Sequence, residues 1–73
     1  MQDIPVSSSL IAAASYDAEM QELALTFKSG ARWIYGNGAQ PFTQEDADAF
    51  ASASSAGKWF LEMIKGQWPE RPA

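Results

Sequence analysis

The segment Leu23-Ala-Leu-Thr-Phe-Lys-Ser-Gly-Ala-Arg-Trp-Ile-Tyr35 decides the fold class of this chain. Apolar and polar residues alternate from Glu22 to Phe27, which is the period of a half-buried β-strand. Lys28-Ser29-Gly30 suits a three-residue hairpin loop, because glycine takes the left-handed conformation that the third position needs. A two-residue loop would leave the returning aromatics on the exposed face, so the three-residue loop separates polar from apolar residues better. The predicted hairpin therefore places these large side chains on one face: Leu23, Leu25, Phe27, Trp33 and Tyr35.

The segments on either side of this hairpin complete the predicted fold. Leu10 to Tyr16 is interpreted as an earlier strand, joined to the hairpin by a type I turn that begins at Asp17. Thr43 and Asp46 form a capping box for a helix from about Gln44 to Ala53. The sequence predicts an α+β fold, in which a three-stranded antiparallel β-meander is followed by two short helices packed on one face.

The second predicted helix runs from about Lys58 to Lys65 and ends at Gly66. Phe60, Met63 and Ile64 would form its apolar stripe, because residues three and four apart share one side of an α-helix. Residues 1–9 are predicted to be extended, since Pro5 disfavours helix before it. Residues 70–73 are expected to fray. The whole chain, residues 1–73, is interpreted as a single domain with an ordered core of about residues 4–69.

Composition narrows the possible functions. The chain has 73 residues, no cysteine and no histidine, so the commonest metal ligands and general bases are missing. Its formal net charge of −4 repels phosphate backbones and favours a basic protein surface as partner. No long apolar run is present, and no basic segment precedes Leu10 to Ala14, so neither a membrane span nor a signal peptide is predicted. We expect a cytoplasmic, monomeric protein without cofactor or metal.

For two groups of polar residues, a structural role is a better explanation than a role in catalysis or metal binding. Glu45, Asp46 and Asp48 fall in the first turns of a predicted helix, where the helix dipole favours negative charge. The serines at 7–9 and in 52–55 have no histidine to activate them as nucleophiles. We therefore predict that the chain is not an enzyme and has no catalytic, cofactor-binding or metal-binding residue.

The five basic residues are thinly spread, and two of them lie near tryptophans. Lys58 precedes Trp59, and Lys65 is close to Trp68, a combination of cation and ring that can grip single-stranded RNA. The alternative is that both lysines are solvated and that the rings belong to the core. These four residues are the candidate RNA site.

The order and spacing of several short motifs resemble the KTSC family, a short domain named for the C-terminal extension of some lysyl-tRNA synthetases and also found alone in bacteria and phages. The matching motifs, in chain order, are Ile4-Pro-Val-Ser-Ser-Ser9, Ile11-Ala12, Tyr16-Asp17, Leu25-Thr-Phe-Lys-Ser-Gly30, Trp33-Ile-Tyr35, Gly57-Lys-Trp-Phe60 and Ile64-Lys-Gly-Gln-Trp-Pro69. The resemblance implies a β-meander followed by helices, and it suggests RNA binding by association with a synthetase. Ile34 and Gln67 stand where many members carry polar or basic residues, which removes positive charge.

A free-standing, acidic, single-domain member of this length is also similar to a phage regulator that binds host bacterial RNA polymerase, inhibits initiation and promotes antitermination. The first hypothesis is therefore a transcription regulator that makes protein–protein contacts with a polymerase subunit. The alternative is a small RNA-binding module. The segment Leu10 to Ala14 is interpreted as an exposed sheet edge that could accept a strand of the partner. The predicted partner-binding residues are Leu10, Ile11, Ala12, Ala13, Ala14, Arg32, Ile34 and Trp59.

Overall fold

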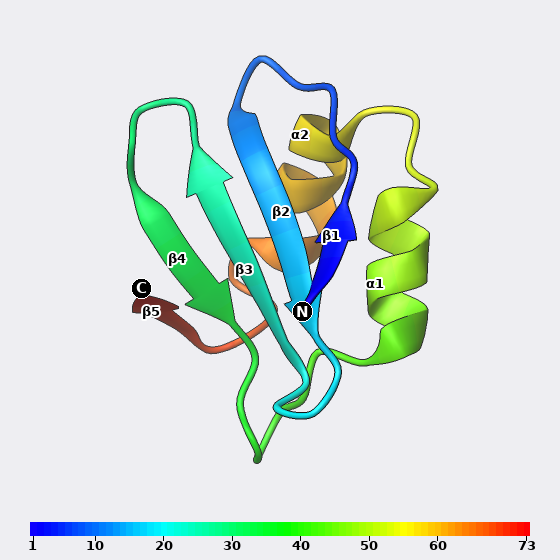
Figure 1. Cartoon of the computed structure of the whole chain (residues 1–73), viewed down its shortest axis with the longest axis vertical. Helices are drawn as coiled ribbons and strands as arrows, with labels where there is room; N and C mark the ends of the chain where they lie inside the picture. Colours follow the sequence, from blue (N-terminus) through cyan, green and yellow to red (C-terminus); the bar gives the residue numbers. More distant parts are fainter.

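The computed structural model describes residues 1–73, which form one five-stranded antiparallel sheet with helices on one side. The strands lie side by side in chain order: β1 (Gln2–Ile4), β2 (Ile11–Asp17), β3 (Glu22–Phe27), β4 (Arg32–Tyr35) and β5 (Glu70–Pro72). The helical segments are α1 (Gln44–Ala51), α2 (Ala56–Trp59) and the π-helix η1 (Phe60–Ile64). Figure 1 looks onto the uncovered face of the sheet, with α2 behind it and α1 beside β1.

The central hairpin has the predicted register. Leu25 pairs with Trp33 and Leu23 pairs with Tyr35 across β3 and β4. The backbone N–H of Phe27 donates to the Ala31 carbonyl over 2.8 Å, and Gly30 has a φ of 96°. The three-residue loop is therefore confirmed, and with it the shared face of the apolar residues.

The sheet has five strands, so the prediction of a three-stranded meander is wrong in strand number. Gln2–Ile4 pairs with the end of β2, and Glu70–Pro72 pairs with β4. Residues 70–72 are therefore part of the sheet, and the expectation that they fray is also wrong. Both added strands are only three residues long and have no room for a period-2 pattern. Their pairing is set by tertiary contacts with the meander, which local sequence patterns do not encode.

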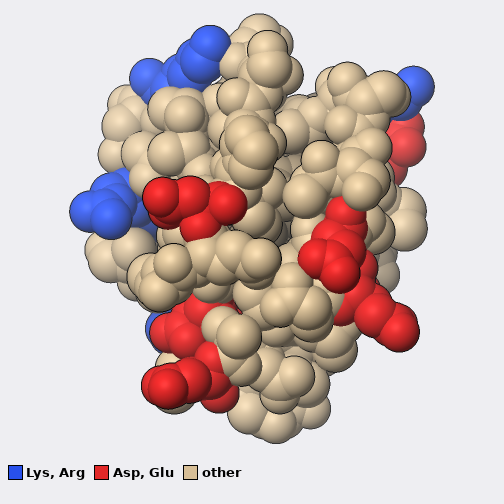
Figure 2. Space-filling view, turned by 45° about the vertical axis from the view of Figure 1, so that its right-hand side comes forward, with Lys and Arg blue, Asp and Glu red and all other residues tan.

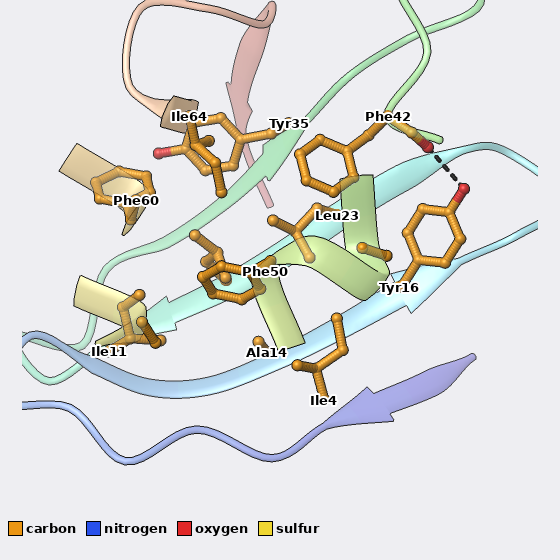
Figure 3. Close-up of a cluster of buried hydrophobic side chains, with 13 residues drawn as sticks. Ile4, Ile11, Ala14, Tyr16, Leu23, Tyr35, Phe42, Phe50, Phe60 and Ile64 are labelled. Atoms are coloured by element: carbon orange, nitrogen blue, oxygen red, sulfur yellow. Dashed lines mark hydrogen bonds between the residues drawn. The ribbon is translucent and has the colours of Figure 1, made fainter. Parts of the chain in front are cut away.

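The core lies between the sheet and the helices. Leu23 and Leu25 are fully buried, Tyr35 is buried, and Phe27 and Trp33 pack against this cluster at its margin. Figure 3 shows side chains of β2, β3 and β4 meeting those of the helical segments around Phe50, Phe60 and Ile64. The predicted burial of the hairpin face under the helices is confirmed.

Phe42 is a core residue that sequence reasoning missed. It is fully buried, and its carbonyl accepts a 2.6 Å hydrogen bond from the Tyr16 hydroxyl. Phe42 immediately precedes the N-cap Thr43, and Ala47, the fourth helical residue, is also buried. This is the hydrophobic-staple pattern, which was the available signal. The capping box itself is confirmed, because Thr43 and Asp46 exchange both hydrogen bonds.

The helical segments differ from prediction in length and type. α1 ends at Ala51, two residues early, and the second helix begins at Ala56 after the N-cap Ser55. The segment after Trp59 is a π-helix, in which the Lys65 N–H bonds the Phe60 carbonyl over 2.9 Å. The wider turn moves side chains out of the i, i+3 stripe. Met63 is consequently 50% exposed, which corrects its assignment to the apolar stripe.

Candidate docking surface

The face of the sheet opposite the helices carries no covering element, and its composition follows from strand register. One row crosses all five strands through directly paired residues: Asp3, Ser15, Ala24, Ile34 and Arg71. A second row contains Ala13, Thr26 and Arg32. We call these eight residues the outer sheet face. Its centre is built from small side chains, and Asp3 and the two arginines lie toward opposite sides of the sheet. Asp17 and Glu22, which pair directly at one end of β2 and β3, face the same way beyond these rows.

A shallow hollow of about 200 Å³ runs across this face. Asp3 lines it on the β1 side and Arg32 lines it on the β4 side, with Ala13, Ser15 and Ala24 among the residues between them. Asp3 and Arg32 are exposed, and neither forms an ion pair within the chain. The hollow therefore presents one free charge of each sign to a partner.

Arg71 differs from Arg32 because its charge is already used inside the chain. Its guanidinium forms a 2.7 Å ion pair with Glu22 on β3 and also donates to the Gly36 carbonyl. These contacts tie β5 to the hairpin next to it. Arg32 is therefore the free cation of the outer sheet face.

The predicted docking edge at Leu10–Ala14 is not an open edge. β2 is an interior strand, in which Ala14 pairs with Ile4 of β1. The Ser8 hydroxyl accepts the backbone N–H groups of Leu10 and Ile11, at 3.0 and 3.1 Å. Ile11 and Ala14 are buried, with 1% and 7% of their surface exposed. An incoming strand therefore has no free row of donors here, which corrects the predicted strand-addition site.

Other residues of that segment keep their access to solvent. Ala12 and Ala13 are exposed, and a bulge separates Ile11 from Ala13 in the pairing with β3. The bulge turns Ile11 to the inner face, while Ala13 stays on the outer sheet face, where Thr26 lies between it and Arg32 in the same hollow. Among the predicted partner-binding residues, the structure thus brings together Ala13, Arg32 and Ile34.

The true edges of the sheet are poor templates for another strand. β1 and β5 have three residues each. Pro5 follows β1, and Pro72 within β5 has no backbone N–H to donate. Short edges with proline and charged residues discourage edge-to-edge pairing. Partner contacts are therefore favoured on the faces of the molecule.

Trp59 lies on the helical side, away from Arg32 and Ile34. Its ring packs at 5.5 Å from Phe50, and it lines a hollow with Lys58 and Glu62. The ring of Trp68 packs against Phe42 in a tilted arrangement, with 4.7 Å between the ring centroids, and its indole N–H donates to the Pro41 carbonyl. Both tryptophans are half-buried.

The four candidate RNA residues are all on this helical side, but an acid separates the two rings. Glu62 lines the hollow of Trp59 and also the neighbouring hollow of Trp68. Lys58 and Lys65 are exposed. Leu61 and Met63, which sequence reasoning did not assign to any surface, are exposed here as well. This side therefore mixes cations, an acid and apolar groups.

The titratable groups with displaced pKa values are two tyrosines of the core. Burial, with a smaller contribution from Glu70, raises the pKa of Tyr35 to about 12. Burial, helped by Asp46 and Asp17, also raises the pKa of Tyr16. A raised pKa keeps both phenols protonated at neutral pH, so neither of them is an activated base.

No group of three or more acidic, cysteine or histidine residues is placed to hold a metal ion. None of the helices combines the length and the apolar character needed to cross a membrane. The prominent surface feature is acidic charge, which Figure 2 shows in several clusters, with basic groups at the margins of the view.

Comparison with known proteins agrees with this fold. The profile of the KTSC domain matches residues 7–68, which is most of the chain. The chain belongs to the KTSC domain family. A crystal structure of a KTSC domain protein from Yersinia pestis has 30% sequence identity and a TM-score of 0.85, covering 99% of this chain and 96% of that one. Among curated proteins there is no match. The resemblance inferred from the motifs is thereby confirmed at the level of the family.

Proposed function

We propose that this KTSC domain is a non-catalytic module that regulates transcription by docking on a bacterial RNA polymerase through its outer sheet face. The observation that carries the proposal is the uncovered face, with the free charges of Asp3 and Arg32 on either side of small residues. Such a surface can meet a protein closely, and charges at its rim fix the orientation of the partner. Ile34, half-buried beside Arg32, adds apolar contact.

The charge of the domain supports a protein partner over nucleic acid. Nine acidic residues outnumber five basic ones, and one of the arginines is held by Glu22. The specific partner, a polymerase subunit, and the expected effects, inhibition of initiation and antitermination, are proposed on the resemblance to a phage regulator that the length and acidity of this single-domain chain suggest. In this proposal the domain works in the cytoplasm of the bacterium whose polymerase it binds.

Binding to purified RNA polymerase tests the proposal directly. The immobilised domain should retain the polymerase, and the Arg32→Asp and Ile34→Asp variants should retain much less. Leu61→Asp is the matched control, because it introduces the same side chain at an exposed apolar position on the helical side. Failure of the wild-type domain to retain polymerase, or loss of binding in the Leu61→Asp variant alone, would contradict the proposal.

A transcription assay then tests the functional part. Wild-type domain added before promoter binding should reduce run-off product, and added after initiation it should increase read-through at a terminator. The Arg32→Asp variant should do neither. If the domain binds polymerase but changes no transcript, docking on polymerase would be supported and the regulatory role would be contradicted.

RNA binding is the second candidate function, and the observation in its favour is that Lys58 lines one hollow with the half-buried Trp59, while Lys65 is exposed on the same side of the molecule. It predicts quenching of tryptophan fluorescence by single-stranded RNA, with an affinity that falls steeply with salt. Replacing both lysines by glutamine should abolish the quenching. Absence of quenching at low ionic strength would remove this candidate.

A further inference from the structure

We propose that the outer sheet face also binds a second copy of this chain, forming a weak two-fold dimer. This inference goes beyond the proposed function, since it concerns only the chain itself. It rests on the arrangement of charge over the face. Asp3 and Arg32 line one hollow, carry opposite charges and have no ion-pair partner within the chain.

Symmetry explains why a second copy fits this face. Asp3 on β1 and Arg32 on β4 are separated by three interstrand steps, or about 14 Å. A two-fold axis between the two sheets, running along the strands between β2 and β3, would place β1 of each copy over β4 of the other. Two reciprocal Asp3–Arg32 pairs then form together, because an isologous interface makes every contact twice. An unrelated partner would need the same two charges at the same spacing.

The rows of small residues are compatible with the same axis. It would set Ser15 over Ala24 of the second copy and Ala13 over its Thr26, so that small side chains meet at the centre. At the end of these strands it also sets Asp17 over Glu22 of the second copy, whose charge is balanced by its ion pair with Arg71. Packed sheets lie about 10 Å apart, a separation that small side chains do not obstruct. Arg32 is two residues along the strand from the row of Asp3, an offset of about 7 Å that its long side chain can span.

The size of the face sets the expected strength. Its outermost strands have three residues each, so the dimer buries an area at or below the lower end for specific interfaces, about 1,200 Å² in total. We therefore expect dissociation constants of roughly 0.1 to 1 mM. The predicted monomer is then the species at low micromolar concentration, and the dimer forms only when the protein is concentrated.

Sedimentation equilibrium of the purified chain, from about 10 μM to about 2 mM, tests the dimer across that range. Wild-type protein should associate at low salt, and less so in about 1 M salt, where charge pairs are screened. Asp3→Arg and Arg32→Asp should each weaken association by about tenfold or more, since each brings like charges together. Circular dichroism should show that both variants keep the fold.

Mixing the two variants provides the decisive arm. Asp3→Arg carries only positive charge at these two positions and Arg32→Asp only negative, so an equimolar mixture should form a heterodimer. The double variant, with both charges exchanged, should associate like the wild type. Glu45→Arg and Lys28→Asp make the same changes in net charge at exposed positions outside the outer sheet face, and should leave association unchanged.

Three results would overturn the proposal. The first is a wild-type chain that remains monomeric over the whole concentration range. The second is association that survives both single substitutions, which would place the interface elsewhere. The third is a variant mixture that does not associate. None of these measurements involves polymerase, so failure of the dimer and failure of the proposed function are separate outcomes.

Discussion

The two faces of the same sheet do different work, although their residues alternate along the same strands. On the inner face, Leu23, Leu25 and Tyr35 have 2% or less of their surface exposed. Between them, Ala24 and Ile34 point outward and meet no helix. The inner face stabilises the fold, whereas substitutions on the outer face should change stability little and can therefore alter the binding of a partner. Stability and binding should therefore separate cleanly by the parity of residue number within β3 and β4.

The largest test of this comparison is truncation of one residue on each face. Leu23→Ala should lower the free energy of unfolding by about 3 kcal/mol, because it removes a fully buried side chain and leaves a cavity. Ile34→Ala should cost about 1 kcal/mol or less, since Ile34 is only half-buried. Urea denaturation gives both values. If Leu23→Ala leaves too little folded protein to measure, Leu23→Val removes a smaller part of the side chain. Equal losses in the free energy of unfolding on the two faces would contradict the division between an inner face for stability and an outer face for binding.

The second test concerns the point where the chain segments converge below the inner face. A Cβ on Gly36 would lie 2.9 Å from both the Gln21 carbonyl oxygen and the Phe42 nitrogen, and its φ is 97°. Gly36→Ala should therefore destabilise the fold by about 2 to 4 kcal/mol. Gly30→Ala is the control, with a φ of 96° and nothing within 4 Å of the added atom. Gly30→Ala should lower the free energy of unfolding by about 1 kcal/mol. The difference between the two substitutions then measures the steric clash at Gly36 separately from the effect of the positive φ.

A smaller effect is expected for the hydrogen bond between Tyr16 and Phe42. Tyr16→Phe removes the donor from a buried 2.6 Å contact, which should cost about 1 kcal/mol. Hydrogen exchange should locate the change, because the bond links β2 to the residue that precedes α1. Unaltered exchange at the start of α1 would show that the staple of Phe42 holds this segment without the hydroxyl.

The smallest effect at neutral pH is that of Tyr35→Phe, whose consequences should appear only in alkali. The unfolded phenol ionises near 10, and the folded one at about 12. Between these values the unfolded state binds fewer protons than the folded state, so stability falls as pH rises. Tyr35→Phe should flatten this decline, measured as the urea midpoint from pH 8 to 12. Tyr16, whose pKa is also raised by burial, contributes a decline in the same direction.

The parts of the fold that sequence predicted are those encoded locally. Alternation and the glycine at position 30 specified the hairpin and its register, and Thr43 with Asp46 specified the start of α1. The same period-2 pattern placed Arg32 and Ile34 on the outer face. These signals work because each depends on residues that are close in the chain.

The parts that were missed depend on contacts distant in the chain. About 35 residues separate β5 from β4, with which it pairs. The residues of β5 are Glu70, Arg71 and Pro72, so the strand has no alternation of apolar and polar residues that would predict it. β1 brings Asp3 to the outer sheet face, which no local pattern indicates. The π-helical turn at Phe60–Ile64 is likewise set by packing, because its sequence fits an ordinary α-helix equally well. The role of Ser8 is different, because its hydroxyl accepts from Leu10 and Ile11, only two and three residues away, and a serine turn of this kind was a local signal that the prediction overlooked.

The placement of β5 has a consequence for how the molecule is assembled. The meander of β2, β3 and β4 can form from neighbouring segments, but the far side of β4 stays unpaired until the helices have turned the chain back. Contacts between distant segments form late, because closing a long loop has an entropic cost. Any partly folded species in which the helices have not yet turned the chain back therefore has an open β4 border, and such a species is more exposed to misassociation than the finished domain.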